Sequence, residues 1–399
     1  MTDILPRILV IAPQPFYQDR GTPIALLHTT RAMVRAGFDV DVVTFKGGTD
    51  PDYAGIRVFR AESRLSSPNL PIGLSWRKIV QHFALYRLTE KMLRQNRYVA
   101  IHAVEEGVIT ARVLTRLSNI PIVYDMHSWL SDELSTLPIL GHWPAIAMIR
   151  AIERRIVCGV NTVFCSLGLG AAAKSLHESE NATEWLFPVQ QPPLDESQNS
   201  SIRSRYGIST ESELIVYTGN LTRNQNIGLF LEAISLLLAT RATTEVAIVG
   251  ATGNDADKLR RKIEPSLLSR IHIIERVPRN CALELMACAD IAVSPRVRGL
   301  NAPLKLFDYV GAGIPVVATD VPAHRVVLGS AAEYCEPVAR DVADAIARLL
   351  DDASRCEEIR VKYAELSRDV FSEGAFNRTV SNVYSHLLGD RIAALTVST

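Results

Sequence analysis

The chain has 399 residues, too many for one ordinary hydrophobic core, so we expect two domains of roughly 150 to 200 residues. Its 43 Lys and Arg residues are balanced by 43 Asp and Glu residues, which excludes the basic excess of a nucleic-acid-binding chain. Hydrophobic residues make up 47% of the chain, which excludes a disordered protein. The six cysteines show no CxxC pairing and no metal-ligand spacing, as expected in a reducing cytosol.

The start of the chain predicts a buried strand rather than a signal peptide. Asp3 precedes the first basic residue, and the apolar run at 8–12 is only five residues long. The longest weakly polar run, at 137–149, contains His142 and two prolines and is too short to span a bilayer. We therefore expect a cytoplasmic protein without a membrane span.

Strands and helices alternate in the first half of the chain. Residues 7–12 form a β-branched run of the kind that is buried on both faces of a sheet. Residues 23–36 have helical spacing of apolar residues, and Gly37 ends this helix. Further strands are expected at 39–45, 99–103 and 121–124. This alternation predicts parallel βαβ units and a Rossmann-like sheet.

The alternation stops and then begins again in the second half. Residues 187–204 are rich in Pro, Gln and Ser and predict an interdomain linker. Strands are then expected at 214–218, 246–250, 271–274, 291–294 and 315–319, and closing helices at 342–350 and 375–388. The pattern predicts an α/β fold of two Rossmann-like domains that face each other across a cleft. Open α/β sheets bind ligands at the carboxyl ends of their strands, so we expect the site there.

Residues 290–319 predict a site for a nucleotide diphosphate. A short strand runs into a loop, and Pro303 then opens a short helix. Cations and backbone N–H groups at the start of a helix can hold phosphate, and a following acid can bind a pair of ribose hydroxyls. Gly311 and Gly313 are interpreted as packing and turn residues. The candidate ligand residues are Arg296, Arg298, Gly299, Asn301, Lys305 and Asp308.

Three blocks resemble family 4 of the retaining glycosyltransferases, whose GT-B fold has two Rossmann-like domains. They are GTPIALLHTTRAMVRAGFDVDVVT at 21–44, IVYTGNLTRNQNIGLFLEAI at 215–234 and the stretch from VPRN to VVAT at 277–319. The resemblance implies transfer of a hexosyl unit from a nucleotide-diphospho-sugar to a glycan or lipid-linked acceptor, with retention of configuration. The setting it implies is the synthesis of cell-surface polysaccharide or glycoconjugate. The expected parts are an acceptor domain at 1–187, a linker at 188–204, a donor domain at 205–372 and a C-terminal helix at 373–399 that packs back on the first domain.

In the first domain the resemblance assigns donor phosphate contacts to Gly21 and Thr22. Gly21 has no Cβ, so backbone amides can approach a pyrophosphate closely, and Thr22 adds a hydroxyl group. A plain tight turn is the alternative interpretation of this glycine.

His127 resembles the histidine of the family that contacts the sugar ring near its reacting carbon. Its expected role is positioning and hydrogen bonding in an oxocarbenium-like transition state. Asp125 is interpreted as a support for the loop rather than as a nucleophile. The other histidines considered, His82, His102 and His142, are interpreted as structural.

The second block departs from the family at two positions. The family usually has an arginine after the glycine and a lysine five residues later, and these neutralise the two phosphates. Asn220 and Gln225 stand here instead, and amides bring no charge. We expect Arg223 or the cations at 296–305 to supply the missing positive charge.

The third block departs as well. The family commonly has two glutamates eight positions apart, and here Leu300 replaces the first and Asp308 the second. The resemblance then leaves hydroxyl recognition to Asn301 and diphosphate binding to Lys305. A solvated i, i+3 pair of Lys305 with Asp308 is the structural alternative. The remaining donor-binding candidates are Leu304, in the same helix, and Val277, which with Pro278 lines the base pocket through main-chain contacts.

We expect no metal and no other cofactor. Asp39 and Asp41 have the spacing of a metal-binding DxD, but they lie in a strand and alternate with apolar residues. Helix dipoles and cations can stabilise a leaving diphosphate without a metal.

The segment 75–98 is a candidate for contact with the acceptor or a membrane. It carries six Lys or Arg residues against one Glu, with Ile79, Phe83, Tyr86 and Met92 roughly on one face. Such a helix can dock on an anionic membrane, which would place the protein at the inner face of the membrane. An ordinary basic helix packed on the sheet is the alternative. The expected partners are the donor and the acceptor, without nucleic acid.

Two other functions fit parts of the sequence. A degenerate transferase would bind nucleotide sugar without turnover, in keeping with the departures at Asn220, Gln225 and Leu300. A sugar-nucleotide epimerase of the same build needs paired acids, and Leu300 argues against it. A classical dehydrogenase is excluded because the first strand is not followed by GxGxxG.

Overall fold

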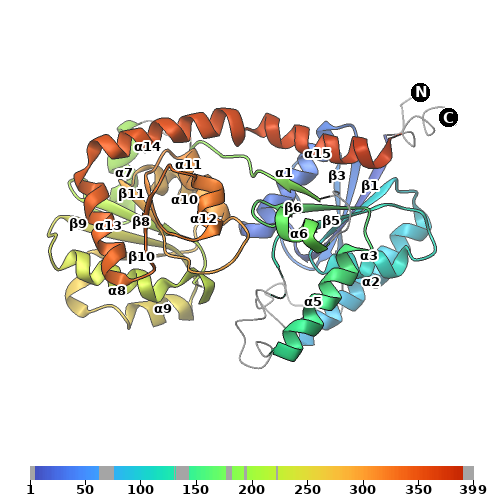
Figure 1. The fold of residues 1–399 in the computed structure, drawn as a ribbon, viewed down its shortest axis with the longest axis horizontal. Helices are drawn as coiled ribbons and strands as arrows, with labels where there is room; N and C mark the ends of the chain where they lie inside the picture. Colours follow the sequence, from blue (N-terminus) through green and yellow to red (C-terminus); the bar gives the residue numbers. More distant parts are fainter. Residues whose placement is uncertain are drawn as a thin grey trace. The chain divides into compact units, whose positions relative to one another are not determined.

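The computed structural model describes residues 5–62, 76–129, 131, 143–176, 182–192, 196–221 and 223–389. Contacts between residues divide the chain into two compact units. The first unit comprises Met1–Leu186 together with Glu373–Thr399, and the second comprises Phe187–Ser372. Each unit is built on one parallel sheet (Figure 1).

The sheet of the first unit has seven strands in the order β3-β2-β1-β4-β5-β6-β7. Strand β1 is buried along nearly all its length, because its aliphatic run is covered on both faces of the sheet. In the register of the sheet, Ile11 of β1 pairs with Val43 on one side and with Ala103 on the other. The strands are β1 (Arg7–Pro15), β2 (Asp39–Phe45), β3 (Ile56–Ala61), β4 (Ala100–Val104), β5 (Ile122–Met126), β6 (Thr162–Ser166) and β7 (Ala182–Trp185).

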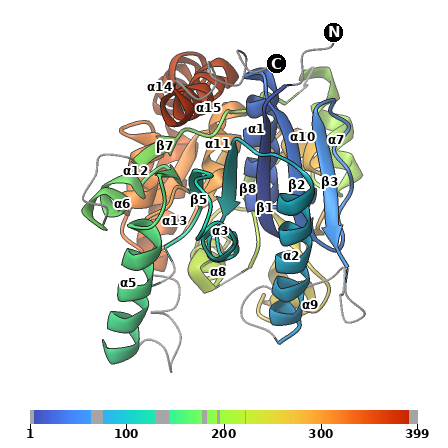
Figure 2. The same ribbon diagram turned by 90° about the vertical axis from the view of Figure 1, so that its right-hand side faces the viewer.

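Helices cover both faces of this sheet. On one face α1 contacts α15, and Tyr384 of α15 packs against Phe38. On the other face α2, α3, α5 and α6 contribute side chains to one core cluster, and Figure 2 shows α3 between α2 and α5. The helices lie on two faces because the parallel strands are joined by right-handed crossovers. Across the sheet the chain moves from β1 to β2 in one direction and from β4 to β6 in the opposite direction, so the connecting helices cover opposite faces. The helices are α1 (Gly21–Arg35), α2 (Trp76–Gln95), α3 (Gly107–Leu114), α5 (Trp143–Val157), α6 (Gly170–Leu176) and α15 (Glu373–Leu388).

The sheet of the second unit has six strands in the order β10-β9-β8-β11-β12-β13. They are β8 (Glu213–Thr218), β9 (Thr244–Ala251), β10 (Ile271–Glu275), β11 (Ile291–Ser294), β12 (Val316–Thr319) and β13 (Glu333–Cys335). The helices are α7 (Asn199–Arg205), α8 (Ile227–Leu238), α9 (Asn254–Arg260), α10 (Arg279–Ala287), α11 (Leu304–Gly311), α12 (Pro322–Leu328), α13 (Ala339–Asp351) and α14 (Ala353–Glu365). Helix α7 lies partly within the range that the sequence assigns to the linker.

Two glycines at the end of α11 allow a close approach and a turn. A Cβ on Gly311 would lie 2.5 Å from the carbonyl oxygen of Gln190, so only glycine lets the segment at 187–192 pass there. Gly313 has a φ of 69°, a left-handed conformation that ends the helix.

The prediction of an α/β fold with two parallel sheets is confirmed. None of the helices in the described ranges has the length and hydropathy needed to cross a bilayer.

Candidate active site

The loop between β11 and α11 is folded around the side chain of Arg296. Strand β11 is fully buried and ends at Ser294, and its register with β12 places the loop at the carboxyl edge of the sheet. The buried guanidinium of Arg296 donates to the carbonyl oxygen of Asn301 at 3.0 Å and to its side-chain oxygen at 2.7 Å. It also donates to the carbonyl oxygen of Arg298, whose own side chain is exposed. Arg296 therefore holds the loop in shape and contributes positive charge from beneath it.

Gly299 is the residue that permits this arrangement. Its φ is 108°, and a Cβ at this position would lie 1.8 Å from a guanidinium nitrogen of Arg296. A side chain at 299 would therefore both strain the backbone and displace the arginine.

Lys305, in the first turn of α11, meets Gln225 at the end of the short 3₁₀ segment Arg223–Gln225. Its Nζ donates to Oε1 of Gln225 at 2.8 Å and lies 4.2 Å from the centre of the Tyr217 ring. Burial lowers the pKa of Lys305 to about 7, and the positive charge of Arg296 adds to the shift. A bound anion would reverse this shift, so the ammonium group is suited to contact one.

Asp308 is held by an arginine that the sequence does not single out. Its carboxylate, 6% exposed, accepts hydrogen bonds from both Nη atoms of Arg279, at 2.5 and 3.2 Å. Nε of Arg279 also donates to Oε1 of Gln190 at 3.1 Å. Burial raises the pKa of Asp308, and the charge and hydrogen bonds of Arg279 oppose the shift. The solvated pair of Lys305 with Asp308 is therefore wrong, because Lys305 contacts Gln225 and Asp308 contacts Arg279.

The loops after β8 and β10 carry the other candidates of this unit. A Cβ on Gly250 would lie 2.6 Å from the carbonyl oxygen of Gly219, so the backbone after β8 passes close to the end of β9. Asn220 is exposed, and its carbonyl oxygen accepts from the Tyr217 hydroxyl at 2.8 Å. Val277 is half-buried between β10 and α10, and Leu304 is half-buried at the first position of α11. The side chain of Arg223 lies outside the described part of the structure.

Helices α11 and α1 begin without a side-chain cap among the described residues. Pro303 precedes α11, and Gly21 and Thr22 are the first two residues of α1. A Cβ added to Gly21 would have no neighbouring atom within 4 Å, so the space beside this residue is open. Among the residues that the structure describes, no cap side chain therefore accepts from the first-turn amides of either helix.

His127 follows β5 in the first unit and lies beside a fully buried carboxylate. Its Nε2 is 3.1 Å from Oδ2 of Asp125, and its ring centre is 5.2 Å from that of Trp185. Burial by itself would lower the pKa of His127, but the charge and hydrogen bond of Asp125, with the charge of Glu105, raise it. The imidazole is therefore biased toward its cationic form.

The other histidines considered in the sequence are His82, His102 and His142. His102 lies in β4 with Nε2 3.0 Å from Oδ2 of Asp125, so the same carboxylate holds two imidazoles. The ring of His82 packs edge-on against Phe45, with 5.1 Å between the centres. His142 lies outside the described residues.

A metal site does not emerge from the described part of the chain, where no group of three His, Cys, Asp or Glu side chains could hold an ion. The DxD-like Asp41 is fully buried and accepts hydrogen bonds from Arg57 and Tyr98, each at 2.8 Å. Its carboxylate serves the packing of β2 against β3 and the segment before β4.

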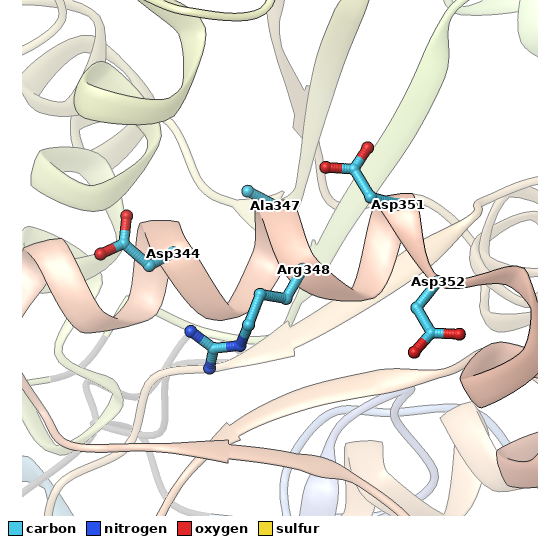
Figure 3. Close-up of a pocket in the computed structure, with 5 residues that line it drawn as sticks. All are labelled: Asp344, Ala347, Arg348, Asp351 and Asp352. Carbon is cyan, nitrogen blue, oxygen red and sulfur yellow. The ribbon is translucent and has the colours of Figure 1, made fainter.

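An open depression of about 580 Å³ lies along α13 (Figure 3). Three of its five lining residues are aspartates, and such a surface repels a diphosphate. We therefore do not assign it to the donor. It is lined by Asp344, Ala347, Arg348, Asp351 and Asp352.

Comparison with known proteins covers both units. The family described as "Glycosyl transferase 4-like domain" matches residues 20–168, and the one described as "Glycosyl transferases group 1" matches residues 212–352. The chain is 27% identical over 364 residues to a phosphatidyl-myo-inositol mannosyltransferase of Mycolicibacterium smegmatis, covering 90% of this chain and 87% of that protein.

Two solved structures resemble the whole chain in fold. Sucrose-phosphate synthase from Thermosynechococcus elongatus superposes with a TM-score of 0.78 at 16% identity, covering 96% of this chain and 99% of that one. HepE of Anabaena in complex with UDP-glucose superposes with a TM-score of 0.73 at 14% identity, covering 95% and 99%. At these identities the likeness shows the fold, which is GT-B.

Proposed function

We propose that this chain, which belongs to family 4 of the glycosyltransferases and takes its sugar from a nucleotide sugar, moves a hexosyl unit with retention of configuration. The acceptor is a glycan or a lipid-linked glycan in the synthesis of cell-surface polysaccharide or glycoconjugate. The observation that carries the proposal is the half-buried amine of Lys305 at the start of α11, which donates to Gln225 and is influenced by the charge of Arg296. The relatives support it, because one is a phosphatidyl-myo-inositol mannosyltransferase and another was solved with UDP-glucose.

Lys305 is the side chain that we assign to the diphosphate. Amides at 220 and 225 lack the charges usual in the family, so the chain falls in a sub-group in which a cation on α11 replaces them. Arg296 adds charge through the loop, and the first-turn amides of α11 add N–H donors. The full set proposed for the donor is Gly21, Thr22, Asn220, Arg223, Gln225, Val277, Arg296, Arg298, Gly299, Asn301, Leu304, Lys305 and Asp308.

Asp308 is proposed to bind the ribose hydroxyls while Arg279 holds its carboxylate. A carboxylate has about four lone-pair sites, so two hydrogen bonds from Arg279 leave acceptor capacity for a hydroxyl pair. The arginine also keeps the acid in one orientation, which binding of a vicinal diol requires.

His127 is proposed to act on the sugar and on the oxygen that leaves with the diphosphate. An imidazole biased toward its cation can stabilise negative charge that develops on that oxygen. Asp125 is unsuited to be a nucleophile, because its carboxylate is fully buried and accepts from His102 and Trp185.

A lipid-linked acceptor would bring the protein to a membrane, and the first unit has a surface that fits one. Ile79 and Phe83 on α2 are 70% and 66% exposed, whereas Met92 on the same helix is 5% exposed. The prediction that one apolar face of this segment includes Met92 is therefore wrong, because the side chain of Met92 packs into the core. The neighbouring helices α3 and α5 add further exposed apolar side chains, and we call this side of the three helices the α2–α3–α5 surface. Its exposed apolar residues are Ile79, Phe83, Ile109, Val113, Met148 and Ile152.

Charge on the same three helices favours an anionic membrane. Together they contain nine Lys or Arg residues and two Glu residues, although the whole chain is neutral. One of the two acids, Glu153, is buried and accepts from the backbone N–H of Ser131 at 2.8 Å. Exposed apolar groups among cations are typical of a protein that lies on a membrane surface. The basic residues are Arg77, Lys78, Arg87, Lys91, Arg94, Arg112, Arg150, Arg154 and Arg155.

Calorimetry with a panel of nucleotide sugars, followed by an assay of released nucleoside diphosphate with and without a lipid-linked acceptor, tests the activity. We expect one donor to bind and acceptor-dependent release of diphosphate, with a product that keeps the anomeric configuration of the donor. Binding without release would support the degenerate transferase. Isomerised sugar on an intact nucleotide would support the epimerase.

A further inference from the structure

A continuous chain of buried polar groups leads from the C-terminal helix to His127. The hydroxyl of Tyr384, in α15, is 2.9 Å from Nδ1 of His102. On its other side the His102 ring places Nε2 3.0 Å from Oδ2 of Asp125. The same oxygen is 3.1 Å from Nε2 of His127. The least buried of these four side chains, His127, is 7% exposed.

The chemistry of these groups determines where each proton lies. An ionised carboxylate only accepts hydrogen bonds, so His102 presents Nε2–H to Asp125. Nε2 of His127 lies 3.1 Å from the same oxygen in an ion pair without the alignment of a hydrogen bond, and the negative charge favours a proton on this nitrogen. His102 then accepts at Nδ1, where the Tyr384 hydroxyl donates. Burial raises the pKa of Tyr384 well above its ordinary value, so this hydroxyl keeps its proton. The network thus leaves Nδ1 as the atom of His127 that gains and loses a proton.

Asp125 could not remain charged in this position without its donors. An ionised carboxylate that is fully buried is very costly unless it is paired and hydrogen-bonded. Besides the two imidazoles, Trp185 donates from Nε1 to Oδ1 at 3.3 Å. The same indole packs against His127, with 5.2 Å between the ring centres. The indole therefore restricts the imidazole from its face, and the carboxylate restricts it from its edge.

We propose that Asp125, His102 and Tyr384 are positioning residues for His127, which fix the tautomer and orientation of its imidazole. The inference rests on the proposed function, in which His127 acts on the donor. It also gives α15 a role beyond covering the sheet, because the last helix supplies the hydroxyl at the far end of the network. Because the tautomer and orientation are fixed in advance, Nδ1 of the imidazole already points in one direction. The ring then has no orientational freedom to lose at the moment of reaction.

The surroundings of the imidazole add one more charged group. Glu105, at the end of β4, has a φ of 46°, an unusual conformation for a residue other than glycine. Its carboxylate accepts from the hydroxyl of Ser128, which follows His127, at 3.3 Å. Asp125 and Glu105 are thus the two acids that favour the cation, and His102 competes with His127 for Asp125.

The test combines ¹⁵N NMR of the histidine rings with steady-state kinetics in Asp125→Asn, Tyr384→Phe and the control Tyr363→Phe. Tyr363 is an equally buried tyrosine in the second unit, so the control removes a buried hydroxyl outside the network. In Asp125→Asn we expect the pKa of His127 to fall and its Nε2–H tautomer to lose its dominance. Turnover should fall roughly 100-fold with little change in KM for the donor, as for a displaced reacting group.

Tyr384→Phe is the decisive variant if Asp125→Asn fails to fold, because it removes a single oxygen atom. Loss of one hydrogen bond should lower turnover about fivefold and shift the His127 resonances in the same direction as Asp125→Asn. Tyr363→Phe should leave the His127 resonances unchanged. An unaltered His127 tautomer and pKa in both network variants would overturn the inference, whatever their turnover. A wild-type protein without transfer activity would instead refute the proposed function, and the NMR result would still decide on the network.

Discussion

At the scale of single residues, Lys305 changes its charge near neutral pH. Its pKa is about 7 in the free protein, against an ordinary value of 10.5. A bound diphosphate favours the ammonium form and raises the pKa again, so binding above pH 7 takes up a proton. Affinity should therefore fall as the pH rises through about 7. In the free protein, burial disfavours the ammonium form of Lys305 and so lowers the free energy of unfolding. This destabilisation is complete below pH 7 and disappears as the pH rises toward 10.5.

Lys305→Gln should weaken binding of a nucleoside diphosphate about 10- to 100-fold at pH 6.5, because a charge-assisted hydrogen bond of roughly 1.5 to 3 kcal/mol is lost. It should also remove the proton uptake, measured by calorimetry in two buffers of different ionisation enthalpy. Lys258→Gln, at an exposed lysine of α9, is the control and should change neither quantity. Equal loss of affinity for mono- and diphosphate, with proton uptake intact, would assign Lys305 to the surface.

How far sequence reasoning reaches at this scale depends on whether a contact is local. The role predicted for Lys305 needs only its place in the helix after a loop, and the sequence shows that directly. The pairing of Asp308 with Arg279 joins residues 29 positions apart, so no spacing pattern reveals it. Arg296 is also hard to interpret from sequence, because its guanidinium turns into its own loop beside Gly299.

At the scale of elements, the α2–α3–α5 surface can be tested as a membrane contact. Burial of one large apolar side chain contributes about 1.5 to 3 kcal/mol, and each nearby cation about 1 kcal/mol on an anionic surface. Replacement of two such side chains by serine should thus lower the partition coefficient at least roughly tenfold.

The variant for this test is Phe83→Ser with Ile152→Ser, which changes α2 and α5 together. Leu268→Ser, at a 43% exposed leucine of the second unit, is the matched control. Co-sedimentation should show binding of the wild type and the control to vesicles that contain anionic phospholipid, and weaker binding of the double variant. Equal binding to neutral vesicles, or a double variant that binds like the wild type, would contradict the membrane contact. A second copy of the chain on this surface would appear as a dimer that the double variant loses.

Most central strands were predictable from the sequence, whereas only β10 was predictable among the four edge strands of the described sheets. The runs at 7–12 and 291–294 are predictable because a central parallel strand is apolar at nearly every position. Strands β3, β7 and β13, which lie at sheet edges, were not found, and neither was the five-residue β6. Their residues alternate or mix polar and apolar types, because an edge strand has one neighbour and is only partly covered. The exposed apolar residues of α3 and α5 were missed because spacing alone does not tell an outward stripe from an inward one.

At the scale of the whole molecule, the first unit is made of two separate stretches of the chain. Helix α15 follows the second unit in sequence, yet its contacts belong to the first. It buries five apolar or aromatic side chains there, Phe376, Val380, Val383, Tyr384 and Leu388. At about 1.5 to 3 kcal/mol each, these side chains contribute as much as the whole stability of a typical domain, roughly 5 to 15 kcal/mol.

Ending the chain at Ser372 should therefore unfold the first unit and spare the second. We expect the truncated protein to lose hydrogen-exchange protection in β1, β4 and β5, while β8, β9 and β11 keep theirs. Binding of a nucleoside diphosphate should weaken but remain measurable, because Lys305, Gln225 and Arg279 all belong to the second unit and only the contacts proposed for Gly21 and Thr22 are lost. Ending the chain at Gly389 leaves α15 whole and is the control, which should match the full-length protein in both measurements. Full protection of β1 after truncation at Ser372 would show that the first unit does not need α15, and the network from Tyr384 to His127 would then be dispensable for its fold.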